Sequence, residues 1–264
     1  MKEVFVGGVS ATVVGEDEVD TKEDVMLVVL AHGRTRSKED SLKFAHILQK
    51  SVPNLVCVTW DLPNHGSRLL NPACNDSWNG GNALHMVQMQ AIIDQGSAEA
   101  IDLLEMVTLQ LPGITITKRV MLGVSLGGYI TWSVISQRSD LLTAAIPIIT
   151  SPDTLGVMRQ RWEAYKQESP EEAAKIEPVA LDKDVVARMA RNAAQAETMA
   201  SSQLPIMAIC GGDDPLVPAK FSIQWGANAM PQHRVETVPG VKHEVVREMI
   251  DLTVEYLLSI ATRV

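Results

Sequence analysis

The sequence has little cysteine and a deficit of positive charge, and each of these absences excludes a class of protein. The three cysteines, Cys57, Cys74 and Cys210, are widely spaced in the 264-residue chain and form no CxxC pair, which argues against a disulfide framework or a zinc site. There are 23 Lys and Arg residues against 32 Asp and Glu, a formal net charge of −9. A chain this acidic is not expected to have nucleic acid or an anionic membrane surface as its partner.

Long apolar runs are also missing. Residues 25–31 form a continuous apolar stretch that is far too short to cross a bilayer. Residues 1–14 lack the charged and apolar regions of a signal peptide. With 46% hydrophobic residues the chain is nevertheless apolar enough to fold around a core. We therefore expect a soluble, cytoplasmic protein that acts on small molecules.

What the sequence does contain is an alternation of short apolar runs and stretches of helical spacing. Residues 4–14 are expected to form an N-terminal strand or hairpin with Gly7 and Gly8 in or near its turn. Apolar residues recur at helical spacing over 98–111 and 246–260. Six further strands are predicted at residues 25–31, 55–61, 119–123, 144–150, 205–210 and 234–238.

This alternation predicts an α/β fold. Continuous apolar strands fit a parallel sheet that is covered on both faces, and strand–helix–strand units are right-handed. We predict one domain over residues 1–264 with a mostly parallel, doubly wound sheet of about eight strands. Because ligands of such sheets bind beyond the carboxyl ends of the strands, residues that directly follow a strand are the candidates for a site.

Residues 151–203 are too long for a single crossover helix. They contain Ser169 and Pro170 at the start of a capping-box sequence, and a later run rich in alanine and methionine, 185–200. We predict an insertion of two or three short helices that forms a small lid. Helices that only pack on the core and cover no pocket would fit the pattern equally well.

A G-x-S-x-G sequence, residues 123–127, lies where a predicted strand meets a predicted helix. A sharp turn there would hold Ser125 in strained backbone angles and leave its hydroxyl exposed as a candidate nucleophile. The motif is weak as a string, and a plain glycine-rich turn is the alternative. Its position after a strand is what favours the nucleophile.

A serine nucleophile needs a base, and His243 is the best placed of the six histidines because it follows the last predicted strand. The base needs a carboxylate, which we expect to be Asp214 in the loop after the strand at 205–210. Asp213 lies next to it, Asp153 is a more distant alternative, and a simple Asp-Pro turn would also explain Asp214. The remaining histidines lie in helical stretches, at a strand start or before a loop glycine: His46, His85, His233, His32 and His65.

The strings His32-Gly33, Gly123 to Gly127, Gly211 to Pro218 and Gly240 to His243 together resemble the α/β-hydrolase superfamily. Residues 31–34 together with 61–68 look most like its small intracellular esterase-like members. The resemblance spans nearly the whole chain. It implies that the backbone N–H groups of Arg34 and Leu126 form an oxyanion hole, and that His32 shapes a loop.

We therefore expect a serine hydrolase that cleaves an ester of a small, largely apolar substrate through an acyl-enzyme on Ser125, with no metal or organic cofactor. Met158 and Trp162 of the insertion would form an apolar pocket wall, although core packing is at least as good an explanation. Four arginines there could bind a carboxylate, but a solvated face explains them better: Arg159, Arg161, Arg188 and Arg191.

Other readings stay open. A thioesterase, a lactonase or a carbon–carbon bond hydrolase would use the same three residues, and a non-catalytic ligand receptor or scaffold could keep the same fold. The partner is expected to be a small acyl substrate, and a homodimer is compatible with the sequence.

Overall fold

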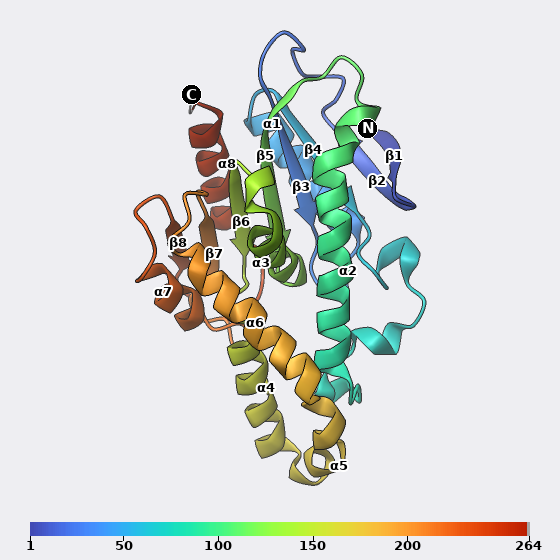
Figure 1. Cartoon of the computed structure of the whole chain (residues 1–264), viewed down its shortest axis with the longest axis vertical. Coiled ribbons are helices and arrows are strands. Elements are labelled where there is room, and N and C mark those ends of the chain that lie inside the picture. The colour runs from blue at the N-terminus through green and yellow to red at the C-terminus, as the bar shows by residue number, and fades with distance from the viewer. Residues whose placement is uncertain (263–264) are drawn as a thin grey trace.

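The computed structural model describes residues 1–262, in which eight strands form a single sheet between two layers of helices (Figure 1). The spatial order is β1-β2-β4-β3-β5-β6-β7-β8. β1 and β2 form an antiparallel hairpin, β2 runs antiparallel to β4, and the other neighbours are parallel. The predicted α/β class and mostly parallel sheet are thus confirmed. The strands are β1 (Lys2–Val6), β2 (Val9–Val14), β3 (Val25–Ala31), β4 (Leu55–Trp60), β5 (Ile116–Val124), β6 (Ala144–Ile148), β7 (Met207–Gly211) and β8 (Arg234–Val238).

The central strand β3 is apolar throughout because the core covers both of its faces. Successive side chains of a strand point to opposite faces, and here both faces are covered. Leu27 and Val29 belong to the core on one face of the sheet, whereas Val28 and Leu30 belong to the core on the other. All seven residues of the strand are buried, so β3 anchors both halves of the core.

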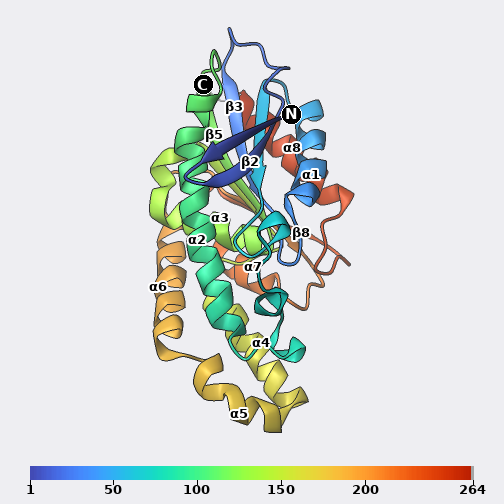
Figure 2. The ribbon, with the colours of Figure 1, turned by 90° about the vertical axis from the view of Figure 1, so that its right-hand side faces the viewer.

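Helices cover both faces of the sheet. α1 (Lys38–Ser51) and α8 (Arg247–Ala261) lie on one face, to which they contribute Leu48 and Tyr256. α2 (His85–Met106) and α3 (Leu126–Arg138) lie on the other, where Leu103 and Ile130 are fully buried. Figure 2 shows the two layers on opposite sides of the sheet. The short helix α7 (Lys220–Gly226) precedes β8.

The insertion at residues 151–203 folds into α4 (Thr154–Glu168), α5 (Pro170–Ala180) and α6 (Lys183–Met199), which extend beyond the sheet in Figure 1. Pro170 does begin α5, as predicted, but the side chain of Ser169 makes no capping hydrogen bond. α6 is capped instead by Asp182, whose carboxylate accepts from the backbone of Val185 at 3.1 Å. No helix in residues 1–262 is long and apolar enough to span a membrane.

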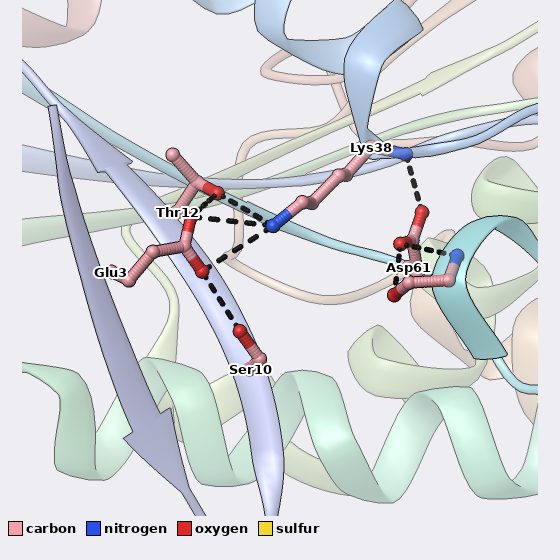
Figure 3. A network of polar contacts seen from close by, with 6 residues as sticks. Glu3, Ser10, Thr12, Lys38 and Asp61 are labelled. Atoms are coloured by element: carbon pink, nitrogen blue, oxygen red, sulfur yellow. Dashed lines mark hydrogen bonds and ion pairs between the residues drawn. The ribbon is translucent and has the colours of Figure 1, made fainter.

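Lys38, the first residue of α1, ties the N-terminal hairpin to the loop after β4 (Figure 3). Its ammonium group donates to Glu3 at 3.2 Å and to Thr12 at 3.0 Å, while its backbone N–H donates to Asp61 at 2.8 Å. Asp61 also accepts from the backbone and hydroxyl of Ser67. These contacts fix the loop that follows β4 at the carboxyl edge of the sheet.

Candidate active site

Ser125 stands between the last residue of β5 and the first of α3. Its backbone angles, φ 54° and ψ −108°, are strained for a residue with a side chain. Its N–H donates to the carbonyl of Ile148 on the neighbouring strand at 2.9 Å. The sharp turn thereby places the hydroxyl at the carboxyl edge of the sheet, where such folds bind ligands.

The two glycines of the motif are required because strand, turn and helix approach one another closely. A Cβ on Gly123 would stand 2.0 Å from the carbonyl oxygen of Gly127. A Cβ on Gly127 would stand 2.2 Å from the carbonyl oxygen of Ala31 on the central strand. Both contacts are with backbone, which cannot swing aside, so only glycine fits at either position.

The structure brings the three predicted side chains into one hydrogen-bonded chain. The Ser125 hydroxyl lies 2.8 Å from Nε2 of His243, and Nδ1 of His243 lies 2.6 Å from Oδ2 of Asp214. The side chain of His243 is 20% exposed and that of Asp214 is 1% exposed. The imidazole can therefore reach both the serine and a substrate, while the carboxylate is shielded from water.

Asp214 is held in place by its own loop. Its other carboxylate oxygen, Oδ1, accepts backbone N–H groups of Leu216 at 2.8 Å and Val217 at 3.0 Å. The two alternative acids lie elsewhere. Asp213 is exposed, and Asp153 caps α4 by accepting from the backbone of Gly156. Of the candidates in this region, only Asp214 is oriented toward His243.

Two backbone N–H groups beside Ser125 are free to bind an anionic oxygen. Leu126 is the first residue of α3, so its N–H has no partner within the helix. Neither this N–H nor that of Arg34 makes a hydrogen bond within residues 1–262, whereas the N–H of Gly127 donates to the carbonyl of His32. Arg34 and Leu126 both line the cavity that contains Ser125. The geometry is thus compatible with the predicted oxyanion hole.

His32 fixes the loop that carries Arg34. Its Nε2 accepts the backbone N–H of Leu62 at 3.0 Å, which leaves Nδ1 to donate to the carbonyl of Gly33 at 2.8 Å. Burial lowers the pKa of His32 to about 4, so the ring is neutral at pH 7. The uncharged tautomer joins the loop after β3 to the loop after β4.

This neutral histidine makes the fold sensitive to acid. Unfolded His32 takes up a proton near pH 6.5 and folded His32 only near pH 4, so the unfolded state binds more protons between these values. Stability should fall as the pH falls through that window, with His32 contributing about 3 kcal/mol. Urea unfolding of the wild type and of His32→Asn, measured from pH 7 to pH 4, checks this. Equal pH slopes for the two proteins would show that His32 does not contribute.

A cavity of about 650 Å³ opens at the triad. Its wall includes Ser125 and His243, the loop after β3, and Phe44 and Ile47 of α1. From the insertion it includes Arg161. The wall is therefore only partly apolar.

Met158 and Trp162 do not line this cavity, which corrects the expectation that they form its wall. Both are almost fully buried in the core, at 0% and 1% exposure. The indole of Trp162 packs edge-on against Trp78, with ring centroids 5.1 Å apart, and lies 5.6 Å from the ring of Tyr165. The face of α4 that carries Met158 and Trp162 therefore packs against the core. Arg161, the residue before Trp162, lines the cavity.

Within residues 1–262, no group of three or more His, Cys, Asp or Glu side chains is arranged to hold a metal ion. Ser125 and His243 line the cavity at the edge of the sheet, and Asp214 lies behind His243. Residues 28–255 match the alpha/beta hydrolase family, which covers most of the chain. The chain belongs to the alpha/beta hydrolase family. The resemblance seen in the sequence is thereby confirmed.

Several solved structures share this fold over nearly the whole chain. TT1662 from Thermus thermophilus superposes with a TM-score of 0.75 at 16% identity, covering 100% of this chain and 98% of that one. A cold-adapted esterase from an Arctic intertidal metagenomic library has a TM-score of 0.59 at 19% identity, with 98% and 92% covered. An enol-lactonase from Burkholderia xenovorans has a TM-score of 0.57 at 15% identity, with 99% and 100% covered. No curated protein matches the chain in sequence.

Proposed function

We propose that this alpha/beta hydrolase is a serine hydrolase that cleaves a carboxylic ester of a small substrate through an acyl-enzyme on Ser125. The observation that carries the proposal is the continuous chain of hydrogen bonds from Ser125 through His243 to Asp214, at 2.8 and 2.6 Å. A serine hydroxyl becomes nucleophilic when an oriented base can accept its proton, and the buried carboxylate supplies that orientation.

In the first half of the reaction, Nε2 of His243 takes the hydroxyl proton as Oγ of Ser125 attacks the ester carbonyl. The resulting oxyanion accepts hydrogen bonds from the backbone of Arg34 and Leu126, and each such donor is typically worth about 3 kcal/mol. The imidazolium, stabilised by Asp214, then gives its proton to the leaving alcohol. The acyl group remains as an ester on Ser125.

Water completes the cycle. His243 takes a proton from a water molecule, the hydroxide attacks the acyl carbonyl, and the second tetrahedral intermediate collapses. The carboxylic acid leaves, and Oγ of Ser125 recovers its proton from His243. A thioester or a lactone would follow the same sequence with a thiol or a ring hydroxyl as the leaving group. Two proteins of similar structure, an esterase and an enol-lactonase, support acyl transfer to water as the reaction.

A fluorophosphonate probe tests the proposal, because it reacts rapidly only with an activated serine. The folded protein should be labelled once per chain within minutes, and prior heat unfolding should abolish the reaction. A receptor or scaffold with an unactivated serine would label no faster than the unfolded chain, and that result would contradict the proposal.

A further inference from the structure

Two arginine side chains in the wall of the catalytic cavity lack an acidic partner. Other arginines of this fold form close ion pairs with carboxylates; Arg68, for example, lies 2.7 Å from Glu99. By contrast, Arg34 donates to the backbone carbonyl of Asn75, and Arg161 donates to Nε2 of His85 at 3.2 Å. Within residues 1–262, neither guanidinium forms an ion pair with a carboxylate. Each keeps further N–H donors free.

The surroundings of these arginines favour an added anion. Burial lowers the pKa of both, and the positive charge of Arg161 lowers the pKa of Arg34 further. Asp76 acts on Arg34 and Asp214 on Arg161 in the opposite sense, but neither carboxylate is in ion-pair contact and the pKa of each arginine stays lowered. Burial and the two positive charges lower the pKa of His85 to about 3, so His85 is neutral and acts as an acceptor for Arg161. A buried charge is stabilised by an opposite charge with good hydrogen-bond geometry. The cavity is therefore prepared for an anion.

A third donor lies in the same wall. Tyr129 of α3 is 4% exposed, and its hydroxyl has no hydrogen-bond partner within residues 1–262. Buried hydroxyl groups normally find a partner, so an unpaired one beside a cavity points to a ligand. Among acidic residues lining the cavity, Asp40 pairs with Lys43 at 3.7 Å and Glu244 is exposed. Asp214 is engaged by His243 and by its own loop.

We propose that Arg161 and Arg34, with the hydroxyl of Tyr129, form an anion subsite, and that the substrate is an ester carrying a free carboxylate. The inference rests on the proposed function, because it places the scissile ester at Ser125 in the same cavity. The planar guanidinium group matches a carboxylate through two parallel hydrogen bonds. A half-ester of a dicarboxylic acid has the required groups: one carboxyl group binds to the arginines and the esterified one reaches the serine.

The test is a binding measurement that needs no turnover. The Ser125→Ala protein is titrated calorimetrically with monomethyl esters of the dicarboxylic acids from succinate to suberate, each compared with the dimethyl ester of the same acid. The two ligands of a pair differ in one negative charge. For at least one chain length, the monoanion should bind about tenfold or more tightly than the neutral diester. Equal or weaker binding of every monoanion would overturn the proposal.

Variants at Arg161 identify the residue responsible. Added to Ser125→Ala, Arg161→Met should weaken binding of the preferred monoanion by about 10- to 100-fold and leave the diester nearly unchanged. Arg161→Lys should restore part of the loss, because it keeps the charge but not the planar fork. Arg159→Met is the matched control, since Arg159 is exposed on the same helix, and it should change neither affinity. A preference that Arg161→Met leaves undiminished would overturn the assignment.

Failure here is distinguishable from failure of the proposed function. If the probe labels Ser125 and neutral esters are hydrolysed, but monoanions show no advantage in binding, only the anion subsite is wrong. If monoanions bind as expected but the serine does not label, the subsite stands and the hydrolase mechanism is wrong.

Discussion

Replacing His243 with alanine is expected to lower kcat for ester hydrolysis by roughly 10⁵- to 10⁶-fold, the loss typical of removing the base of such a triad. The reason is geometric. His243 is the group within hydrogen-bond distance of the Ser125 hydroxyl, at 2.8 Å, so its removal leaves the serine proton with no acceptor. Steady-state hydrolysis of a short-chain p-nitrophenyl ester measures the effect, with the fold checked by circular dichroism.

His46 provides the matched control for this experiment. It lies in α1, outside the residues that line the cavity, and His46→Ala should leave kcat within about twofold of the wild type. If His243→Ala, correctly folded, retained more than about a hundredth of wild-type kcat, His243 would not be the base. Another group would then be the base.

The second large effect is on stability. Gly123→Ala should destabilise the fold by more than about 4 kcal/mol or prevent folding altogether. The added methyl group would stand 2.0 Å from the carbonyl oxygen of Gly127 and 2.6 Å from the hydroxyl of Thr131. Relief would require strand β5 to separate from helix α3, which would also displace Ser125. Urea unfolding followed by tryptophan fluorescence measures the change.

Gly8→Ala is the control that separates the cost of steric crowding at Gly123 from the cost of an unfavourable backbone angle. Gly8 has φ of 83°, which disfavours a side chain, but nothing lies within 4 Å of an added Cβ. Its substitution should therefore cost only about 1–2 kcal/mol, the cost of the left-handed backbone. If Gly123→Ala were no more destabilising than Gly8→Ala, the close approach of strand and helix would not be what requires glycine.

The meeting of Ser125, Asp214 and His243 could be predicted because Ser125 directly follows β5, and the other two lie in the loops after β7 and β8. The period of the apolar runs identifies the strands, and the parallel arrangement brings their carboxyl ends to one edge. Ser125, Asp214 and His243 therefore meet although far apart in the chain. Strand ends were less accurate: β5 begins at Ile116, three residues before the predicted start, because its first residues are half exposed and lack the continuous apolar pattern.

The substrate side of the cavity could not be predicted in the same way. Helical spacing shows that a helix is amphipathic, but it does not say which neighbour its faces meet. Trp162 lies against Trp78, which comes from a distant loop, and this contact turns Arg161 toward the cavity. The sequence alone favours a solvated face for Arg161, whereas the structure places it in the cavity wall. The clue available in the sequence was only the presence of arginines in the insertion.

Locating the acyl group during turnover tests most directly whether Ser125 is the nucleophile. An ester is mixed with the protein, the reaction is quenched in acid within milliseconds to seconds, and the digested protein is analysed by mass spectrometry. We predict an adduct with the mass of the acyl group on Ser125, absent from Ser125→Ala. Steady hydrolysis of the ester by Ser125→Ala at the wild-type rate, or an acyl adduct on a different residue that turns over, would contradict it.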